Sequence, residues 1–219
     1  MSVHFFRELE ELKRSLLALC ARVEEQVHNA VQAMLNRDED LAVAVEQRDT
    51  EIDHREIEIE EDCLKILALY QPVAVDLRFL VAALKINSDL ERIGDLAVNI
   101  ARKARALCHL PELTTPFDLG GMSAKSEAML HDSIDALVNL DARLAKDVCG
   151  RDDAVDKMKR EIRVAAEGMI QQNPENTQPL MRVMAAARNL ERIADCATNI
   201  AEDVIYMTEG GIVRHHEGA

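Results

Sequence analysis

Apolar side chains recur at the spacing of a helix from the start of the chain. Steps of three and four positions alternate through the first such series, which consists of Leu9, Leu12, Leu16, Leu19 and Val23. Charged residues, among them Glu10 and Lys13, fill the positions between them. This is the pattern of a helix that buries one face in a bundle. It predicts a first helix over residues 4–35.

The same spacing predicts five further helices, separated by residues that break helices. Asp38 is a suitable N-cap for the second helix, which should end near Gln71 and Pro72 because proline cannot continue a helix. A third helix is expected from residue 73 to residue 109. Beyond a stretch rich in Pro and Gly, helices are expected over residues 122–139, 141–173 and 176–209.

Two segments one hundred residues apart are nearly the same. Leu90–Ala101 returns as Leu190–Ala201, and nine of the twelve positions are identical in register. The second and fifth predicted helices also match each other, at an offset of 103 residues. Repetition this close indicates that the chain is internally duplicated.

The duplication predicts an all-α fold of two tandem three-helix bundles. The expected parts are a first bundle (residues 1–110), a linker (111–121), a second bundle (122–209) and a flexible tail (210–219). Gly150 aligns with Gln47, which lies inside the second helix. We therefore expect the fifth helix to continue through Gly150, at a cost of about 1 kcal/mol.

The composition fits long helices and narrows the function. The chain has 8 Gly, 5 Pro and 3% aromatic residues, which is typical of helices rather than sheets. Its formal net charge of −14 argues against direct nucleic-acid binding, which needs clustered Lys and Arg. No phosphate-binding loop or nucleophile motif stands out, so we expect that the protein is not an enzyme.

Cysteines and apolar runs indicate a cytoplasmic location. The five cysteines are odd in number and form no C-x-x-C motif, which favours free thiols in a reducing compartment. Glu8, Glu10 and Glu11 near the start are incompatible with a secretory signal peptide. The apolar runs are too short to span a membrane. We expect a soluble cytoplasmic protein.

The duplicated segment carries an acidic stripe. Glu91, Asp95 and Asn99 are spaced four apart, so a helix places them on one narrow face. Like charges at this spacing cost a few tenths of a kcal/mol unless something neutralises them. Local pairing with Arg92 is one way to neutralise them, and a bound cation is the other.

Acidic pairs with the same spacing lie on the second and fifth predicted helices. If those helices neighbour the stripes, four carboxylates and an amide converge in each copy. Such oxygen ligands suit hard cations, and the bound metal would be Mg, Mn, Ca, Fe or Zn. The candidate ligands are Asp49, Asp53, Glu91, Asp95 and Asn99 in the first copy, and Asp152, Asp156, Glu191, Asp195, Asn199 and Asp203 in the second.

The two stripes end differently. Four positions after Asn99 the first copy has Lys103, whereas four positions after Asn199 the second copy has Asp203. The additional carboxylate should add attraction for a cation. From the sequence we therefore expect the second site to bind metal more tightly than the first.

The repeated features resemble the PhoU family. The third and sixth helices carry the motif E-R-I-x-D-x-x-x-N-I-A, the second carries Asp-x-x-x-Asp, and Asp76–Leu80 precedes the first motif. The likeness covers residues 6–207. It implies metal ligands at the eight carboxylates of the acid-x-x-x-Asp motifs, and a homodimer.

The resemblance also implies a function. PhoU proteins are cytoplasmic negative regulators of phosphate uptake and of the phosphate-starvation response. They couple the ATPase subunit of the high-affinity phosphate ABC transporter to a sensor histidine kinase, and they reach the membrane only through these partners.

Two alternatives stay open at this point. Glu25-x-x-His28 and Glu51-x-x-His54 match the spacing of ligands in ferritin-like di-metal oxidoreductases. The second copy, however, does not repeat Glu51 and His54, and such a site needs inward-facing ligands. The other alternative is a metal-free helical scaffold, with acidic stripes that face solvent or a partner.

Overall fold

The computed structural model describes residues 3–210, which form long α-helices and one short 3-10 turn. No helix in this part of the chain is both long and apolar enough to cross a membrane. The elements in chain order are α1 (Val3–Asn36), α2 (Glu39–Tyr70), α3 (Ala74–Cys108), α4 (Leu119–Asn139), α5 (Ala142–Cys149), α6 (Asp152–Gln172), η1 (Pro174–Asn176) and α7 (Thr177–Glu209).

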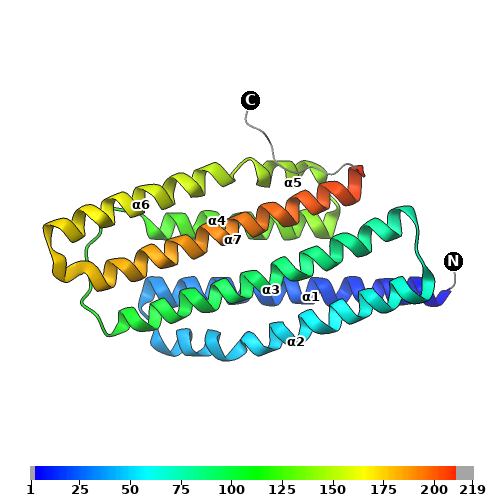
Figure 1. The fold of residues 1–219 in the computed structure, drawn as a ribbon, viewed down its shortest axis with the longest axis horizontal. Helices are drawn as coiled ribbons and strands as arrows, with labels where there is room; N and C mark the ends of the chain where they lie inside the picture. The colour runs from blue at the N-terminus through cyan, green and yellow to red at the C-terminus, as the bar shows by residue number, and fades with distance from the viewer. Residues whose placement is uncertain (1–2, 211–219) are drawn as a thin grey trace.

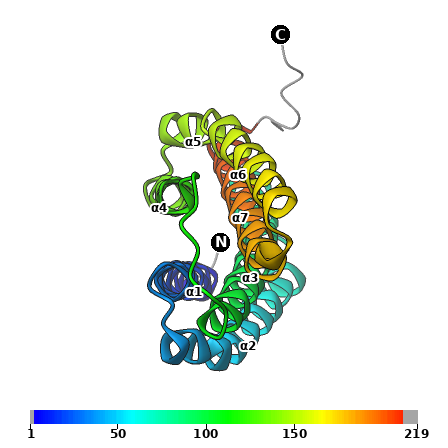
Figure 2. The same cartoon turned by 90° about the vertical axis from the view of Figure 1, so that its left-hand side faces the viewer.

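The helices form two bundles that lie side by side in an elongated molecule (Figure 1). The first bundle is α1–α3 and the second is α4–α7. Seen from the end, α2, α3, α7 and α6 form a curved layer, with α1 and α4 inside the curve (Figure 2). α3 packs along α7 and joins the two bundles. The predicted all-α fold of two three-helix units is confirmed, and the sixth predicted helix is α7.

Equivalent turns begin the second helix of each unit. Arg37 and Leu140 both have positive φ, at 53° and 50°, and each precedes an aspartate. Asp38 accepts a hydrogen bond from the backbone N–H of Leu41, which confirms its role as an N-cap. Asp141 accepts from two backbone N–H groups in the same way. The side chains therefore satisfy helix ends that the backbone leaves unpaired.

The prediction of an unbroken fifth helix is wrong. α5 ends at Cys149 and α6 starts at Asp152, with a turn between them. The N–H of Gly150 donates to two carbonyls, those of Lys146 and Asp147, and Arg151 N–H donates to Val148. Gly has low helix propensity, and Arg151 also bonds the side chains of Asp147 on α5 and Asp132 on α4. These bonds stabilise the turn, which places Asp152 in the first turn of α6.

The predicted start of the fourth helix is three residues late. α4 begins at Leu119, because Asp118 accepts a 2.7 Å hydrogen bond from the N–H of Gly121 and serves as its N-cap. Gly120 and Gly121, which suggested a loop, therefore lie in the first helical turn. The predicted tail from residue 211 onward lies outside the described residues.

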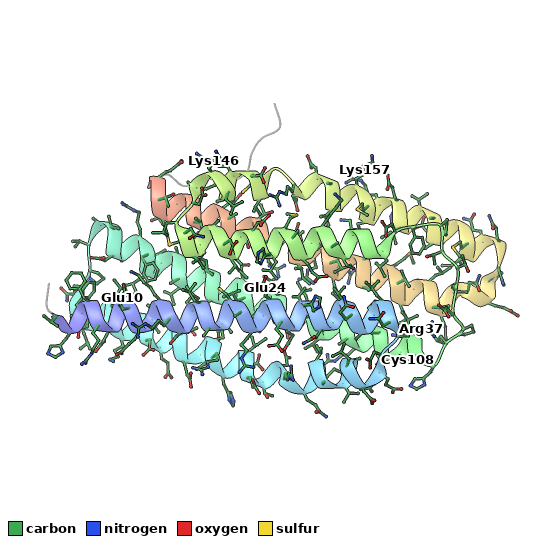
Figure 3. The ribbon with its side chains drawn as sticks, turned by 180° about the vertical axis from the view of Figure 1, so that it is seen from behind. Glu10, Glu24, Arg37, Cys108, Lys146 and Lys157 are labelled. Carbon is green, nitrogen blue, oxygen red and sulfur yellow. The ribbon has the colours of Figure 1, made fainter. Side chains whose placement is uncertain are left out.

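α1 and α4 contact each other through two reciprocal His–Glu pairs. Glu24 of α1 lies 2.6 Å from His131 of α4, and His28 of α1 lies 2.9 Å from Glu127 of α4. Each pair joins one repeat to the other, because Glu24 and His28 correspond to Glu127 and His131 at the offset of 103 residues. The four side chains line a hollow of about 530 Å³ between the helices. Figure 3 shows Glu24 on the side of α1 that neighbours α4.

The backbone of α3 at Gly94 lies close to the side chain of Ile52 on α2. A Cβ atom on Gly94 would lie 3.2 Å from Cδ1 and 3.3 Å from Cγ2 of Ile52. The second repeat has Ala194 and Val155 at these positions, both buried. Compared with Gly94 and Ile52, the second repeat has one carbon more on α7, in Ala194, and one fewer on α6, in Val155. The two pairs therefore contain the same number of side-chain carbons.

We expect a favourable coupling between Gly94→Ala and Ile52→Val. Alanine should gain less than the usual ~1 kcal/mol of helix propensity, because its Cβ crowds Ile52. Ile52→Val alone should cost about 1 kcal/mol. The free energy of unfolding of the double variant, measured with urea, should be higher than the sum of the two single effects predicts, by at least about 0.5 kcal/mol. Strict additivity would show that the contact is not tight.

Acidification should strengthen the contact between α1 and α4. The hydrogen bond with Glu24 raises the pKa of His131 above its usual 6.5, and the nearby charges of Glu24 and Asp135 add to this. A raised imidazole pKa stabilises the fold below pH 6.5, and that stabilisation is lost as pH rises through the raised value.

His131→Gln should therefore lower the free energy of unfolding at pH 6, by less than about 1 kcal/mol because the pair is exposed. At pH 8.5 the variant and the parent should unfold at the same urea concentration. His54→Gln, at an exposed position on α2, is the control. An equal loss at both pH values would contradict an ionic contribution.

Candidate metal sites

The structure brings the predicted carboxylates together in each repeat. α2 packs along α3, and α6 packs along α7, so the acidic pair on one helix faces the acidic stripe on the next. In the second repeat Lys159 contacts both Asp156 and Glu191. In the first repeat, a Cβ atom on Gly94 of α3 would lie 3.8 Å from Oδ1 of Asp49 on α2. We call Asp49, Asp53, Glu91 and Asp95 the first cluster, and Asp152, Asp156, Glu191 and Asp195 the second cluster.

In the first cluster, partial burial and neighbouring carboxylates disfavour the charged forms. Burial raises the pKa of Asp49, and the charges of Asp53 and Asp95 raise it further. Burial also raises the pKa of Glu91, followed by the charges of Asp95 and Asp53. Carboxylates on α2 therefore raise the pKa of a carboxylate on α3, and carboxylates on α3 do the same for α2.

The second cluster behaves in the same way. Burial, then Asp156 and Glu191, raises the pKa of Asp152. Burial raises the pKa of Asp195 to about 6, together with the charges of Glu191 and Asp152.

The side chains as placed do not enclose a metal ion. Within residues 3–210, no group of three His, Cys, Asp or Glu side chains is arranged to hold one. Ligation would therefore require these half-buried and exposed carboxylates to rotate about their side-chain bonds toward a common point. The all-oxygen donor set fits a hard cation, which would also relieve the mutual repulsion.

The first cluster makes no direct ion pair with a described basic side chain, although the charge of Arg102 acts on Asp49. Gln26 donates a 3.1 Å hydrogen bond to Asp49. Of the described Lys, Arg and His side chains, none makes an ion pair within 4.0 Å with the four carboxylates, so the pairing considered for Arg92 is not formed. The side-chain oxygen of Asn87, one turn before Glu91, is buried and has no hydrogen-bond partner. An orphaned oxygen beside an unneutralised acidic patch is compatible with a cation site.

The second cluster contains its own cation, Lys159. Its Nζ lies 2.6 Å from Glu191 and 3.0 Å from Asp156. The sequence reasoning missed this residue. Alignment of the repeats could have revealed it, because Lys159 corresponds to Glu56 at the offset of 103 residues.

The end of the second stripe contacts α3. Asn199 donates a 3.3 Å hydrogen bond to Asp89 of α3, so it faces the other repeat. Asp203 is buried and accepts a 2.6 Å hydrogen bond from Lys85 of α3. Asn99 is half-buried, one turn after Asp95 on α3. The structure thus uses Asn199 and Asp203 to join α7 to α3.

The residues of the ferritin-like alternative face outward. Glu25 pairs with Arg48 at 3.2 Å, and Glu51 pairs with Arg22 at 3.6 Å, both on the surface. His28 is exposed and contacts Glu127 of the other repeat. These residues therefore lack the inward orientation of a di-metal bundle site.

The described cysteines take no part in either cluster. All five are free, as predicted. Burial raises the pKa of the Cys20, Cys63 and Cys196 thiols to about 12, so they stay protonated and act as packing groups.

Removing one charge from the second cluster should stabilise the metal-free protein. The raised pKa of Asp195 means that the fold favours its protonated form. The associated stability is present below about pH 4 and is lost as pH rises through about 6. In the presence of a chelator, Asp195→Asn should raise the free energy of unfolding at pH 7.5 by an amount on the order of 1 kcal/mol, after allowance for solvent screening.

At pH 4 this variant and the parent should have equal stability. Asp62→Asn, which changes an exposed carboxylate elsewhere on α2, should have no such pH-dependent effect. If Asp195→Asn destabilises the protein at pH 7.5, the carboxylate is satisfied by its neighbours rather than repelled.

Comparisons with known proteins agree with the duplicated fold. The PhoU domain matches residues 16–104 and again residues 119–204. A phosphate-specific transport system accessory protein PhoU homolog from Pseudomonas aeruginosa is 39% identical over 98% of this chain and 89% of its own. A homolog with the same description from Aquifex aeolicus is 39% identical over 96% and 95%.

Solved structures show the same architecture. The crystal structure of PhoU from Pseudomonas aeruginosa superposes with a TM-score of 0.91 at 37% identity, covering 94% of this chain and 100% of that one. The regulatory protein PhoU from Streptococcus pneumoniae gives 0.86 at 29% identity, covering 96% and 100%. The resemblance deduced from the repeated motif is confirmed, and the chain belongs to the PhoU family.

Proposed function

We propose that this protein is an accessory protein of a phosphate-specific transport system and acts there as a negative regulator. The observation that carries the proposal is the match of both repeats to the PhoU domain. Relatives described as accessory proteins of that system align over nearly their whole length. The function therefore belongs to the complete two-repeat unit.

The regulator works through protein contacts. It couples the ATPase subunit of the phosphate ABC transporter to a sensor histidine kinase in the cytoplasm, and it reaches the membrane only through them. Apolar side chains exposed at the turn between α2 and α3, namely Leu69, Val73 and Val75, suit such contacts or a homodimer. The formal net charge of −14 makes basic partner surfaces the favoured ones.

Metal binding is the second part of the proposal. A divalent or trivalent cation (Mg, Mn, Ca, Fe or Zn) would be held by Asp49, Asp53, Glu91 and Asp95. The support is their mutual repulsion across α2 and α3 and the lack of a nearby ion-pairing cation. Such a cation would supply the missing positive charge and fix α2 against α3, which is a structural rather than catalytic role.

Deletion of the gene should switch on the phosphate-starvation response when phosphate is plentiful. The measurement is a reporter under a starvation-inducible promoter in phosphate-rich medium, together with the rate of phosphate uptake. Reintroducing the full chain should restore repression, and the second repeat alone should not. A deletion strain that stays repressed and takes up phosphate normally would contradict the regulatory role.

Removal of the first cluster should abolish its bound metal and leave the helices intact. The variant Asp49→Asn, Asp53→Asn, Glu91→Gln, Asp95→Asn keeps the side-chain sizes, and its side chains lie outside the apolar core. Elemental analysis after purification without chelators should show less metal than in the parent, with unchanged far-UV circular dichroism. Glu58→Gln with Glu60→Gln, at exposed positions of α2, is the control. A parent with no metal would instead favour a metal-free scaffold.

A further inference from the structure

We infer that the ammonium group of Lys159 is the resident cation of the second cluster, and that it keeps external metal ions out of that cluster. The two repeats then have the same fold but different roles, since only the first cluster can accept a metal ion. The role of the first cluster rests on the function proposed above, whereas the role of Lys159 rests on its own contacts.

Lys159 bridges two helices from the centre of the cluster. Its Nζ lies 3.0 Å from Oδ1 of Asp156 on its own helix and 2.6 Å from Oε1 of Glu191 on α7. Arg160 lies 3.3 Å from Oδ2, the other oxygen of Asp156. Three of the oxygens that a metal would need therefore already accept charge-assisted hydrogen bonds.

The position of Lys159 is partly shielded from solvent. Its side chain is 29% exposed, and that of Glu191 is 16% exposed. Charges interact more strongly there than on an open surface, because water screens them less. A divalent ion entering the cluster would be repelled by the ammonium and would have to displace it from both carboxylates.

The first repeat lacks both of the basic groups that contact the second cluster. Glu56 replaces Lys159 and the uncharged Ile57 replaces Arg160. Asn87, with its unpartnered buried oxygen, occupies the place of Ala187. The first repeat therefore has oxygen-bearing side chains, Glu56 and Asn87, where the second has Lys159 and Ala187.

This assignment reverses the order of affinity expected from the acidic stripes alone. That expectation depended on Asp203 as an additional carboxylate of the second site. Asp203 instead forms an ion pair with Lys85 of α3 at 2.6 Å, so it does not add its charge to the second cluster.

The test uses the full chain with the first cluster disabled by Asp49→Asn and Asp95→Asn, so that any bound ion reports on the second cluster. Mn²⁺ is the probe, because it prefers oxygen ligands and its binding can be followed by calorimetry and by its electron paramagnetic resonance signal. In this background, Lys159→Gln should tighten Mn²⁺ binding at the second cluster by about tenfold or more. Lys159→Glu, which recreates the charge of the first repeat, should tighten it further.

The matched control is Lys157→Gln in the same background. Lys157 lies on the same helix, is 72% exposed and reaches only Glu161, at 3.9 Å. Figure 3 shows it on the outer side of α6. Removing this charge should leave Mn²⁺ binding unchanged within about twofold, whereas a general charge effect would make the two variants equal.

Two results would overturn the inference. One is Mn²⁺ binding to the second cluster that is equally tight with and without Lys159. The other is a second cluster that stays empty in Lys159→Gln and Lys159→Glu, with circular dichroism showing that both are folded. The first cluster is tested separately, in the Glu191→Gln, Asp195→Asn background. Its failure to bind would count against the proposed metal function and leave the result for Lys159 standing.

Discussion

The packing of α3 along α7 is the constraint on which the rest of the molecule depends. These two helices carry the duplicated motif, and each serves its own bundle on one face and the other bundle on another. Most of their apolar residues are buried, and two polar pairs, Lys85 with Asp203 and Asn199 with Asp89, link the two helices. α2 and α6 lie at the two ends of the same curved layer, where each packs against a helix that carries an acidic stripe.

Charge, rather than shape, distinguishes the repeats. Glu91 and Glu191 occupy equivalent places on equivalent helices, yet one faces carboxylates and the other an ammonium group. Carboxylates held close together are unfavourable until a positive charge neutralises them. A lysine supplies that charge permanently, because it is part of the chain. A bound cation would supply it only while it is present.

The sequence predicted the helices and the acidic clusters more completely than the contacts that individual side chains make with other helices. Apolar periodicity located each long helix, because a bundle buries one face of every helix. It could not locate the break at Gly150, which depends on Arg151 bonding to Asp147 and to the distant Asp132. Spacing also placed Asp203 on the acidic stripe. Each step of four residues overshoots a full turn by roughly 40°, so Asp203 is rotated by about 120° from Glu191 and pairs with Lys85 of α3. Packing between helices decides which side chains pair with each other. The geometry of a single helix does not contain that information.

The reciprocal pairs Glu24–His131 and His28–Glu127 have a consequence for how the molecule can deform. The bundles are held at α3 and α7 by a continuous apolar seam, but at α1 and α4 by exposed polar pairs beside a hollow. Exposed polar pairs cost little to break in water, so the contact between α1 and α4 is easier to open than the apolar contact between α3 and α7.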